Sequence, residues 1–134
     1  MIRAMQTLPG LQVLRGNALF AALLGVLLLL APSHRLYDTF GLPIAQPELF
    51  TQLAGVFSIA LAALLWEAPA RVLLERLIGR AVCTANALSV LVTLLWLVSG
   101  ELDVNATGKV VLGLVTAILG VFALLEARYF QPAG

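Results

Sequence analysis

Long apolar runs, interrupted by charge only at wide intervals, dominate the pattern along this chain. The runs that contain no Asp, Glu, Lys or Arg are residues 16–33, 49–66, 81–100 and 110–125. A helix that crosses a bilayer needs about 20 mainly apolar residues, with ~17–25 being usual. The fourth run reaches this length if Lys109 and Glu126 extend their polar ends to the membrane surfaces. The pattern therefore predicts four transmembrane helices, at about 14–32, 48–67, 80–99 and 109–128.

The lipid interior dictates which fold these runs can adopt. Lipid offers no hydrogen-bond partner to backbone N–H and C=O groups, so runs of this length are expected to be helical. Composition agrees, because 61% of the 134 residues are hydrophobic and 11% are charged, whereas about a quarter of a soluble domain is charged. We expect an all-α integral membrane protein, with residues 1–134 forming a single four-transmembrane-helix bundle. The first run resembles a signal peptide but lacks a good small-x-small cleavage site, so we expect a retained helix.

Positive charges are distributed unevenly over the predicted loops. With the N-terminus in the cytoplasm, the cytoplasmic side would hold Arg3, Arg15, Arg71, Arg76, Arg80 and Arg128, and the other side Arg35 and Lys109. Because Lys and Arg are enriched on the cytoplasmic side of membrane proteins, this bias predicts that both termini are cytoplasmic. The Leu/Ala/Arg-rich composition is typical of bacteria, so we expect the cytoplasmic (inner) membrane. The segment 67–80 is amphipathic and is expected to lie at the inner surface, with Glu75 facing water and Ile78 facing lipid.

One stripe of the third predicted helix is polar. Asn86, Ser89 and Thr93 follow helical spacing, and Asn17 on the first helix should lie at a similar depth. Polar side chains in membrane helices hydrogen-bond across helix contacts, so we expect Asn86 to be a packing contact paired with Asn17. Two alternatives stay open. The four residues Asn17, Asn86, Ser89 and Thr93 could line a path for a substrate or ion, or the stripe could contact another subunit.

Four charged residues mark the predicted cytoplasmic helix ends: Arg15, Glu67, Arg80 and Glu126. In each predicted hairpin an arginine at the start faces a glutamate at the end, so we expect one interfacial ion pair per hairpin. The alternative is a proton or cation site at Glu67 or Glu126, as in small coupled transporters. Such a carboxylate usually lies within the span, and the edge position predicted for both glutamates argues against this alternative.

Short sequence matches hint at an internal repeat. "NAL" occurs at 17–19 and 86–88, and "ALLWEA" at 63–68 resembles "ALLEA" at 123–127. Each match falls at the equivalent place in its predicted hairpin. Two hairpins of the same topology could have arisen by duplication, but the matches are short and made of common residues, so chance remains an equal alternative.

Few residues suggest chemistry. His34 is the only histidine and is a weak candidate for a metal ligand, while Cys83 is the only cysteine. We find no catalytic constellation and expect no enzyme activity, no cofactor and no metal. A net charge of +1 provides no basic face for nucleic acid.

The first half of the chain resembles a known group of membrane proteins. The segments "LLGVLLLLAPSHRLYDTFGLP" and "LAGVFSIALAALLWEAP" are similar to the first hairpin of small bacterial four-helix membrane proteins of the DoxX-like kind. The resemblance implies a four-helix fold. Some members of that group resemble subunits of quinol-oxidising systems, and no functional residue is carried over from it.

Three functions remain compatible with the sequence. The first is a small accessory or structural subunit of a larger membrane protein complex, with membrane lipids and other membrane subunits as its partners. The second is a small homo-oligomeric transporter or channel that uses the polar stripe on the third helix. The third, with least support, is a carrier that binds a quinone or pigment between its helices.

Overall fold

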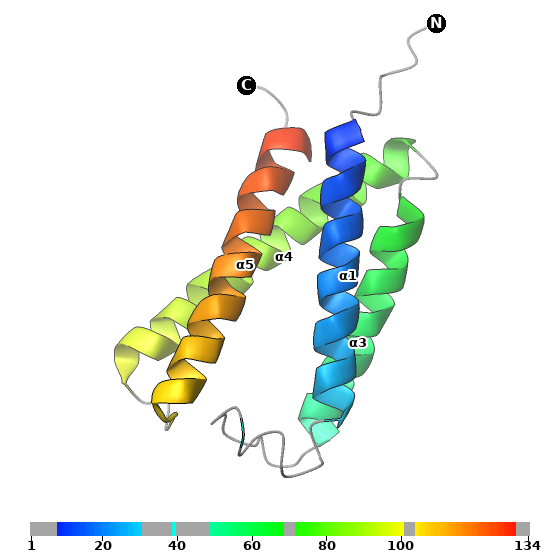
Figure 1. The fold of residues 1–134 in the computed structure, drawn as a ribbon. Helices are drawn as coiled ribbons and strands as arrows, with labels where there is room; N and C mark the ends of the chain where they lie inside the picture. The colour runs from blue at the N-terminus through cyan, green and yellow to red at the C-terminus, as the bar shows by residue number, and fades with distance from the viewer. Residues whose placement is uncertain (1–7, 31–38, 40–48, 69–71, 101–103, 131–134) are drawn as a thin grey trace, which may run out of the picture.

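In the part of the chain that it describes, the computed structural model contains four long α-helices (Figure 1). It describes residues 8–30, 39, 49–68, 72–100 and 104–130. The helices are α1 (Leu8–Leu30), α3 (Leu49–Glu67), α4 (Val72–Ser99) and α5 (Ala106–Phe130). No strand occurs in these described ranges. The prediction of an all-α, four-helix fold is therefore confirmed.

Three helices begin earlier than predicted. The difference is largest for α1, which begins at Leu8 instead of residue 14, and for α4, which begins at Val72 instead of residue 80, while α5 begins at Ala106 instead of residue 109. Pro9 does not prevent the early start of α1, because the first turn of a helix tolerates proline. The segment from Val72 to Gly79 is rich in Leu, Glu and Arg, which are good helix formers. Runs without charge mark the apolar part of a helix, and these helices extend beyond that part.

The early start of α4 corrects the prediction for segment 67–80. This segment was expected to lie at the membrane surface, with Glu75 in water and Ile78 in lipid. In the structure its residues from Val72 onward are the first turns of α4, and both Glu75 and Ile78 are buried. Ile78 packs with Leu65 and Ala68 at the C-terminal end of α3. The first turns of α4 are therefore part of the core.

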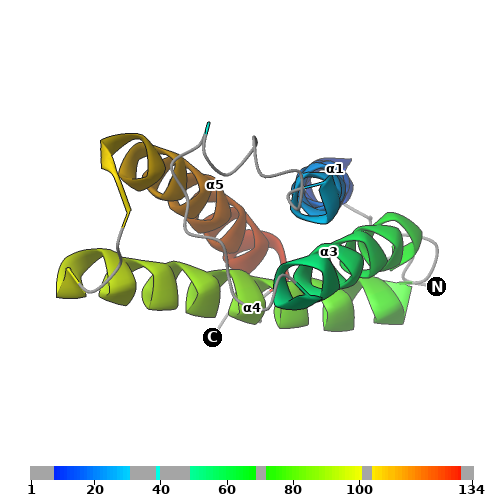
Figure 2. The ribbon, with the colours of Figure 1, turned by 90° about the horizontal axis from the view of Figure 1, so that it is seen from below.

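The helices form two antiparallel hairpins, α1 with α3 and α4 with α5, and α1 also contacts α5. The hairpins meet at the end of the molecule where α1 and α4 begin and where α3 and α5 end (Figure 1). Toward the opposite end they diverge. Figure 2 shows α4 along one face of the molecule, with α5 and α1 on the other side. We call the end where the hairpins meet the junction.

The hydrophobic core lies at the junction. Its buried members come from or adjoin all four helices: Leu14, Ala18, Leu65, Ala68, Ile78, Val82 and Phe130. The ring of Phe130 covers Gly79, where a Cβ atom would lie within 3 Å of three ring carbons. Glycine at this position therefore lets the end of α5 pack directly on the backbone of α4.

Within the first hairpin, the backbones of α1 and α3 approach closely at Gly25 and Gly55. A Cβ atom on Gly25 would lie 2.8 Å from the carbonyl oxygen of Gly55, and the reverse distance is also 2.8 Å. Small residues permit this kind of close helix contact in membrane proteins. These two glycines therefore set the separation of α1 and α3.

Three helices are long and apolar enough to cross a membrane. The spans are Pro9–Leu30, Glu75–Ser99 and Ala106–Phe130, while the apolar part of α3, Thr51–Glu67, is shorter. Many large apolar side chains on the outer surface are exposed, among them Phe57, Val98 and Leu124. These features suggest a membrane location.

Candidate functional site

Glu126 is a fully buried carboxylate at the junction, with 0% of its surface exposed. The sequence predicts an interfacial carboxylate that pairs with an arginine, whereas the structure places this carboxylate inside the protein. The helices α1 and α4 begin about two turns before the apolar runs that predicted them. Their additional turns and the Phe130 side chain cover the last turns of α5.

Two asparagine side chains bind this carboxylate. The Nδ2 atom of Asn17 on α1 donates to Oε1 of Glu126 at 2.6 Å, and Nδ2 of Asn86 on α4 donates to Oε2 at 2.9 Å. Both asparagines are themselves buried, at 2% and 6% exposure. We call these three residues the Glu126 cluster. It joins three helices and connects the two hairpins.

The cluster confirms part of the prediction made for the asparagines. Asn17 and Asn86 do lie at the same depth and do act as interhelical contacts, but each binds Glu126 and no direct bond joins them. Nothing in the local sequence identifies the carboxylate as their shared partner. One feature of the sequence could have pointed to this partner. Two buried amides at the same depth require acceptors, and Glu126 lies at that depth.

The other two members of the predicted stripe do not reach the cluster. The hydroxyl of Ser89 donates to the carbonyl oxygen of Ala85 at 2.8 Å, and that of Thr93 donates to the carbonyl oxygen of Ser89 at 2.8 Å. Ser89 is exposed and Thr93 is only partly buried. Both hydroxyls are therefore satisfied by their own helix, as is common for Ser and Thr in membrane helices.

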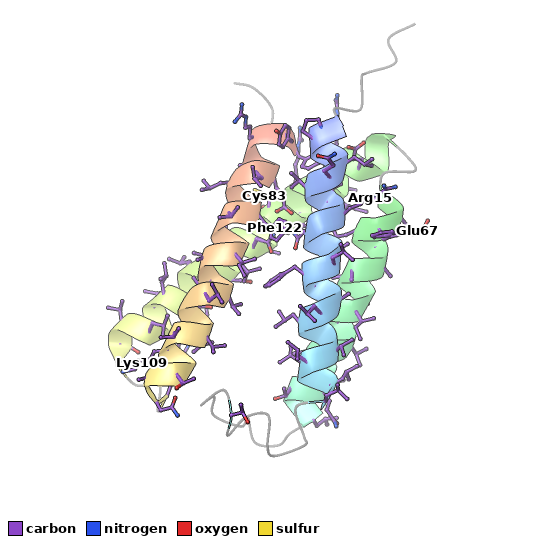
Figure 3. All side chains as sticks on the ribbon, in the orientation of Figure 1. Arg15, Glu67, Cys83, Lys109 and Phe122 are labelled. Carbon is purple, nitrogen blue, oxygen red and sulfur yellow. The ribbon has the colours of Figure 1, made fainter. Side chains whose placement is uncertain are left out.

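The four charged residues at the helix ends find partners other than those expected. The Nε atom of Arg80 donates to the carbonyl oxygen of Phe130 at 2.8 Å, while Glu126 binds the two amides. The guanidinium of Arg15 lies 5.5 Å from the centre of the Trp66 ring, and Glu67 is exposed. The structure therefore places neither predicted ion pair among the interactions of these described residues. Figure 3 shows Arg15 and Glu67 at the junction end and Lys109 at the opposite end.

Next to the cluster, an aromatic contact separates it from an apolar pocket. Phe20 of α1 and Phe122 of α5 lie with ring centres 6.1 Å apart, and Phe122 is one turn before Glu126 on the side of α5 that faces α1 (Figure 3). Beyond it, an open pocket of about 280 Å³ is lined by Ala117, Ile118, Val121 and Phe122. Cys83 also joins α4 to α5, through a contact of 3.4 Å between its Sγ and the carbonyl oxygen of Ala123.

The two sequence repeats occupy unequal environments. Asn17 and Asn86 are the asparagines of the two "NAL" matches, and Glu67 and Glu126 are the glutamates of the two C-terminal matches. Asn86 binds the glutamate of its own hairpin, whereas Asn17 binds the glutamate of the other hairpin. Glu67 is exposed and Glu126 is buried. The hairpins share a topology but differ at this polar contact.

The chemical groups of the cluster are one carboxyl and two neutral amides. They provide oxygen acceptors and N–H donors, but no nucleophile beside a base. No group of three or more His, Cys, Asp and Glu side chains within the described ranges could hold a metal ion. The predicted weak ligand, His34, lies outside the residues that the structure describes.

No protein-family model matches this chain, and neither the search of curated proteins nor the search of solved structures found a match. The resemblance of the first hairpin to DoxX-like proteins therefore stays a prediction.

Proposed function

We propose that this chain is a small integral membrane protein that serves as an accessory or structural subunit of a larger membrane protein complex. The observation that carries the proposal is the closure of the Glu126 cluster. Asn17, Asn86 and Glu126 are buried and bind one another. The polar groups inside the bundle are used to hold its own helices together.

The outer surface supports the same proposal. Large apolar side chains cover it, including Phe57, Val98 and Leu124, and such faces contact lipids or the helices of partner subunits. Gly113 on α5 is exposed, and a Cβ atom there would meet nothing within 4 Å. Small residues at an open position allow a partner helix to approach closely. We propose other membrane subunits and membrane lipids as the partners.

The proposed setting is the cytoplasmic membrane of a bacterium, with both termini in the cytoplasm. Its support is the excess of arginine at the predicted cytoplasmic helix ends. The structure is compatible with it, because the start of α1 and the end of α5 lie at the same end of the molecule (Figure 1).

A homo-oligomeric transporter or channel is the second candidate, and one observation favours it. A carboxylate buried inside a membrane segment usually marks an ion pathway or a proton relay, and Glu126 is such a carboxylate. A path along α4 receives less support, because Ser89 and Thr93 bond to their own helix.

One measurement separates the two candidates. The particle would be extracted from native membranes in a mild detergent, its mass determined and its chains identified. Other polypeptides in a fixed ratio are the expected result. A particle that contains only copies of this chain would overturn the subunit proposal and favour the transporter.

A pair of matched variants adds a structural control. Gly113→Leu and Ala60→Leu each add bulk at an exposed small residue, the first on α5 and the second on α3. Neither change should unfold the chain. We expect Gly113→Leu to reduce the amount of partner that co-purifies and Ala60→Leu to leave it unchanged.

A further inference from the structure

Within the described ranges, the Glu126 carboxyl is bound by two amides and by no cation. Burying an ionised carboxylate costs several kcal/mol, even after relaxation, unless an opposite charge or several strong donors compensate it. The partners of Glu126 are two neutral amides, one from Asn17 and one from Asn86. Among the residues that the structure describes, no Lys or Arg forms an ion pair with Glu126.

Most charged and titratable groups on the surrounding helices have other partners or are exposed. Arg15 on α1 lies over Trp66, and Arg80 on α4 donates to the carbonyl oxygen of Phe130. Cys83 on α4 contacts the carbonyl oxygen of Ala123. The remaining groups near the junction are the exposed Glu67, Arg76 and Arg128, the half-buried Tyr129 and the buried Glu75. None of the described cations neutralises the carboxylate.

We propose that the Glu126 cluster is a binding site for one small monovalent cation, either a proton or an alkali cation. Both candidates share the required chemistry, which is a single positive charge held by oxygen atoms. The inference goes beyond the proposed accessory role and does not depend on it, because it concerns the charge of the cluster and not the partner of the chain.

The geometry of the cluster suits such an occupant. Three helices bring together two carboxylate oxygens and two side-chain amides. Each amide carries an oxygen acceptor as well as an NH₂ donor, so a rotation of the side chain by half a turn exchanges one for the other. A protonated Glu126 could then donate to an amide oxygen, and an alkali cation could take oxygens from all three residues, since hard cations prefer oxygen ligands.

The position of the cluster connects its occupancy to the contact between the hairpins. The bond from Asn17 to Glu126 crosses from the first hairpin to the second. Leu14 and Ala18, on either side of Asn17 along α1, belong to the hydrophobic core at the junction. A bound cation removes the cost of the buried charge and favours the closed junction. Loss of the cation leaves an ionised carboxylate that is better solvated when the junction opens. Cation binding at the Glu126 cluster therefore stabilises the contact between the two hairpins.

Infrared spectroscopy tests the binding site directly. The full chain would be placed in phosphatidylcholine nanodiscs, and carboxylic acid and carboxylate bands would be followed against pH in choline chloride and in NaCl. We expect a carboxylic acid band that is absent from Glu126→Gln and is kept in the control Glu67→Gln. A band insensitive to NaCl identifies a proton. A band converted to carboxylate by NaCl, but not by choline chloride, identifies an alkali cation.

A carboxylate band for Glu126 at every pH, unchanged by NaCl, would overturn the proposal. If Glu126→Gln does not fold, labelling of the wild-type chain with an apolar carbodiimide replaces the comparison, since this reagent attacks protonated carboxyl groups. Mass spectrometry would then locate the label. Labelling of Glu126 that falls as pH or NaCl rises supports the site, and absence of labelling at all pH values contradicts it.

A distance measurement tests whether cation binding stabilises the contact between the hairpins. Spin labels at Leu27→Cys on α1 and Val110→Cys on α5 would report the separation of the hairpins. The native cysteine would be replaced by Cys83→Ser, because a serine hydroxyl can still donate to the carbonyl oxygen of Ala123. Both label sites are exposed. We expect the distance distribution to broaden when the cation is removed, and to stay fixed in Glu126→Gln. An unchanged distribution in the wild-type sequence would overturn the coupling of occupancy to the hairpins.

Discussion

Asn17 and Glu126 lie 109 positions apart in the sequence, and their side chains meet at 2.6 Å inside the junction. This contact connects the first helix of the chain to the last. It also explains why the glutamate is not at the surface, because α1 passes directly over the turn of α5 that carries it. The bond therefore belongs both to the fold and to the candidate site.

Substitution of Asn86 tests the contribution of the cluster to stability. Asn86→Ala removes one of the two donors to Glu126 and leaves one carboxylate oxygen buried without a partner. We expect a loss of about 1–3 kcal/mol, with the helices still folded at room temperature. A thermal melt in detergent, followed by circular dichroism, measures the change. Ser89→Ala is the matched control, because this hydroxyl bonds only to its own helix, and its effect should stay within about 0.5 kcal/mol. Equal effects of the two variants would contradict the role of the cluster.

The two neutral replacements of Glu126 should differ in their effect. Glu126→Leu removes both acceptors and leaves the amides of Asn17 and Asn86 buried without partners, at a cost of about 1–3 kcal/mol for each. Glu126→Gln keeps an acceptor and a donor in place, so its free energy of unfolding should stay much closer to that of the wild-type sequence. Chemical unfolding in mixed micelles measures both variants. A Leu variant as stable as the Gln variant would show that the amides need no partner here.

Two glycine substitutions test the packing of the first hairpin, one at the contact between α1 and α3 and the other on α5 as a control. A Cβ atom on Gly25 would lie 2.7 Å from Cγ1 of Ile59 and 2.8 Å from the carbonyl oxygen of Gly55. Gly25→Ala must therefore separate α1 from α3, and we expect a loss of about 1–3 kcal/mol. Gly113→Ala meets nothing within 4 Å and should stabilise α5 by about 0.5–1 kcal/mol. A melting temperature of Gly25→Ala that stays at or above the wild-type value would contradict the close contact.

The contact of Arg15 with Trp66 should contribute little to stability. The guanidinium lies 5.5 Å from the ring centre, but both side chains are exposed. A cation–π contact at an exposed site is worth about 0.5–1 kcal/mol. We expect Arg15→Gln to lower the stability by no more than this and to shift the emission of Trp66. A loss several times larger would indicate that Arg15 has another partner at the junction.

The number and order of the helices follow from the apolar runs, because lipid leaves the backbone no other way to satisfy its hydrogen bonds. The residues at which α1 and α4 begin do not follow from these runs. The charges between Arg71 and Arg80 suggest a surface segment, but this stretch forms the start of α4 and packs into the core at the junction.

The candidate site was predicted only in part. The asparagines could be selected because a side-chain amide in a membrane helix needs a partner. Their partner could not be predicted, because the sequence does not show which polar group near the helix ends Glu126 meets. An arginine is the more usual partner for a glutamate. Which neighbour it meets depends on where α1 and α4 begin, and this property belongs to the packed structure.

The unequal surroundings of Glu67 and Glu126 have a consequence for how such a chain can be built. Two ionised glutamates facing one another inside the junction would repel, so a pair of hairpins with the same topology has room for only one acid at their shared end. Exposure of Glu67 resolves this conflict. The halves of the chain thereby acquire separate roles, one contributing a donor and the other contributing both a donor and the acceptor.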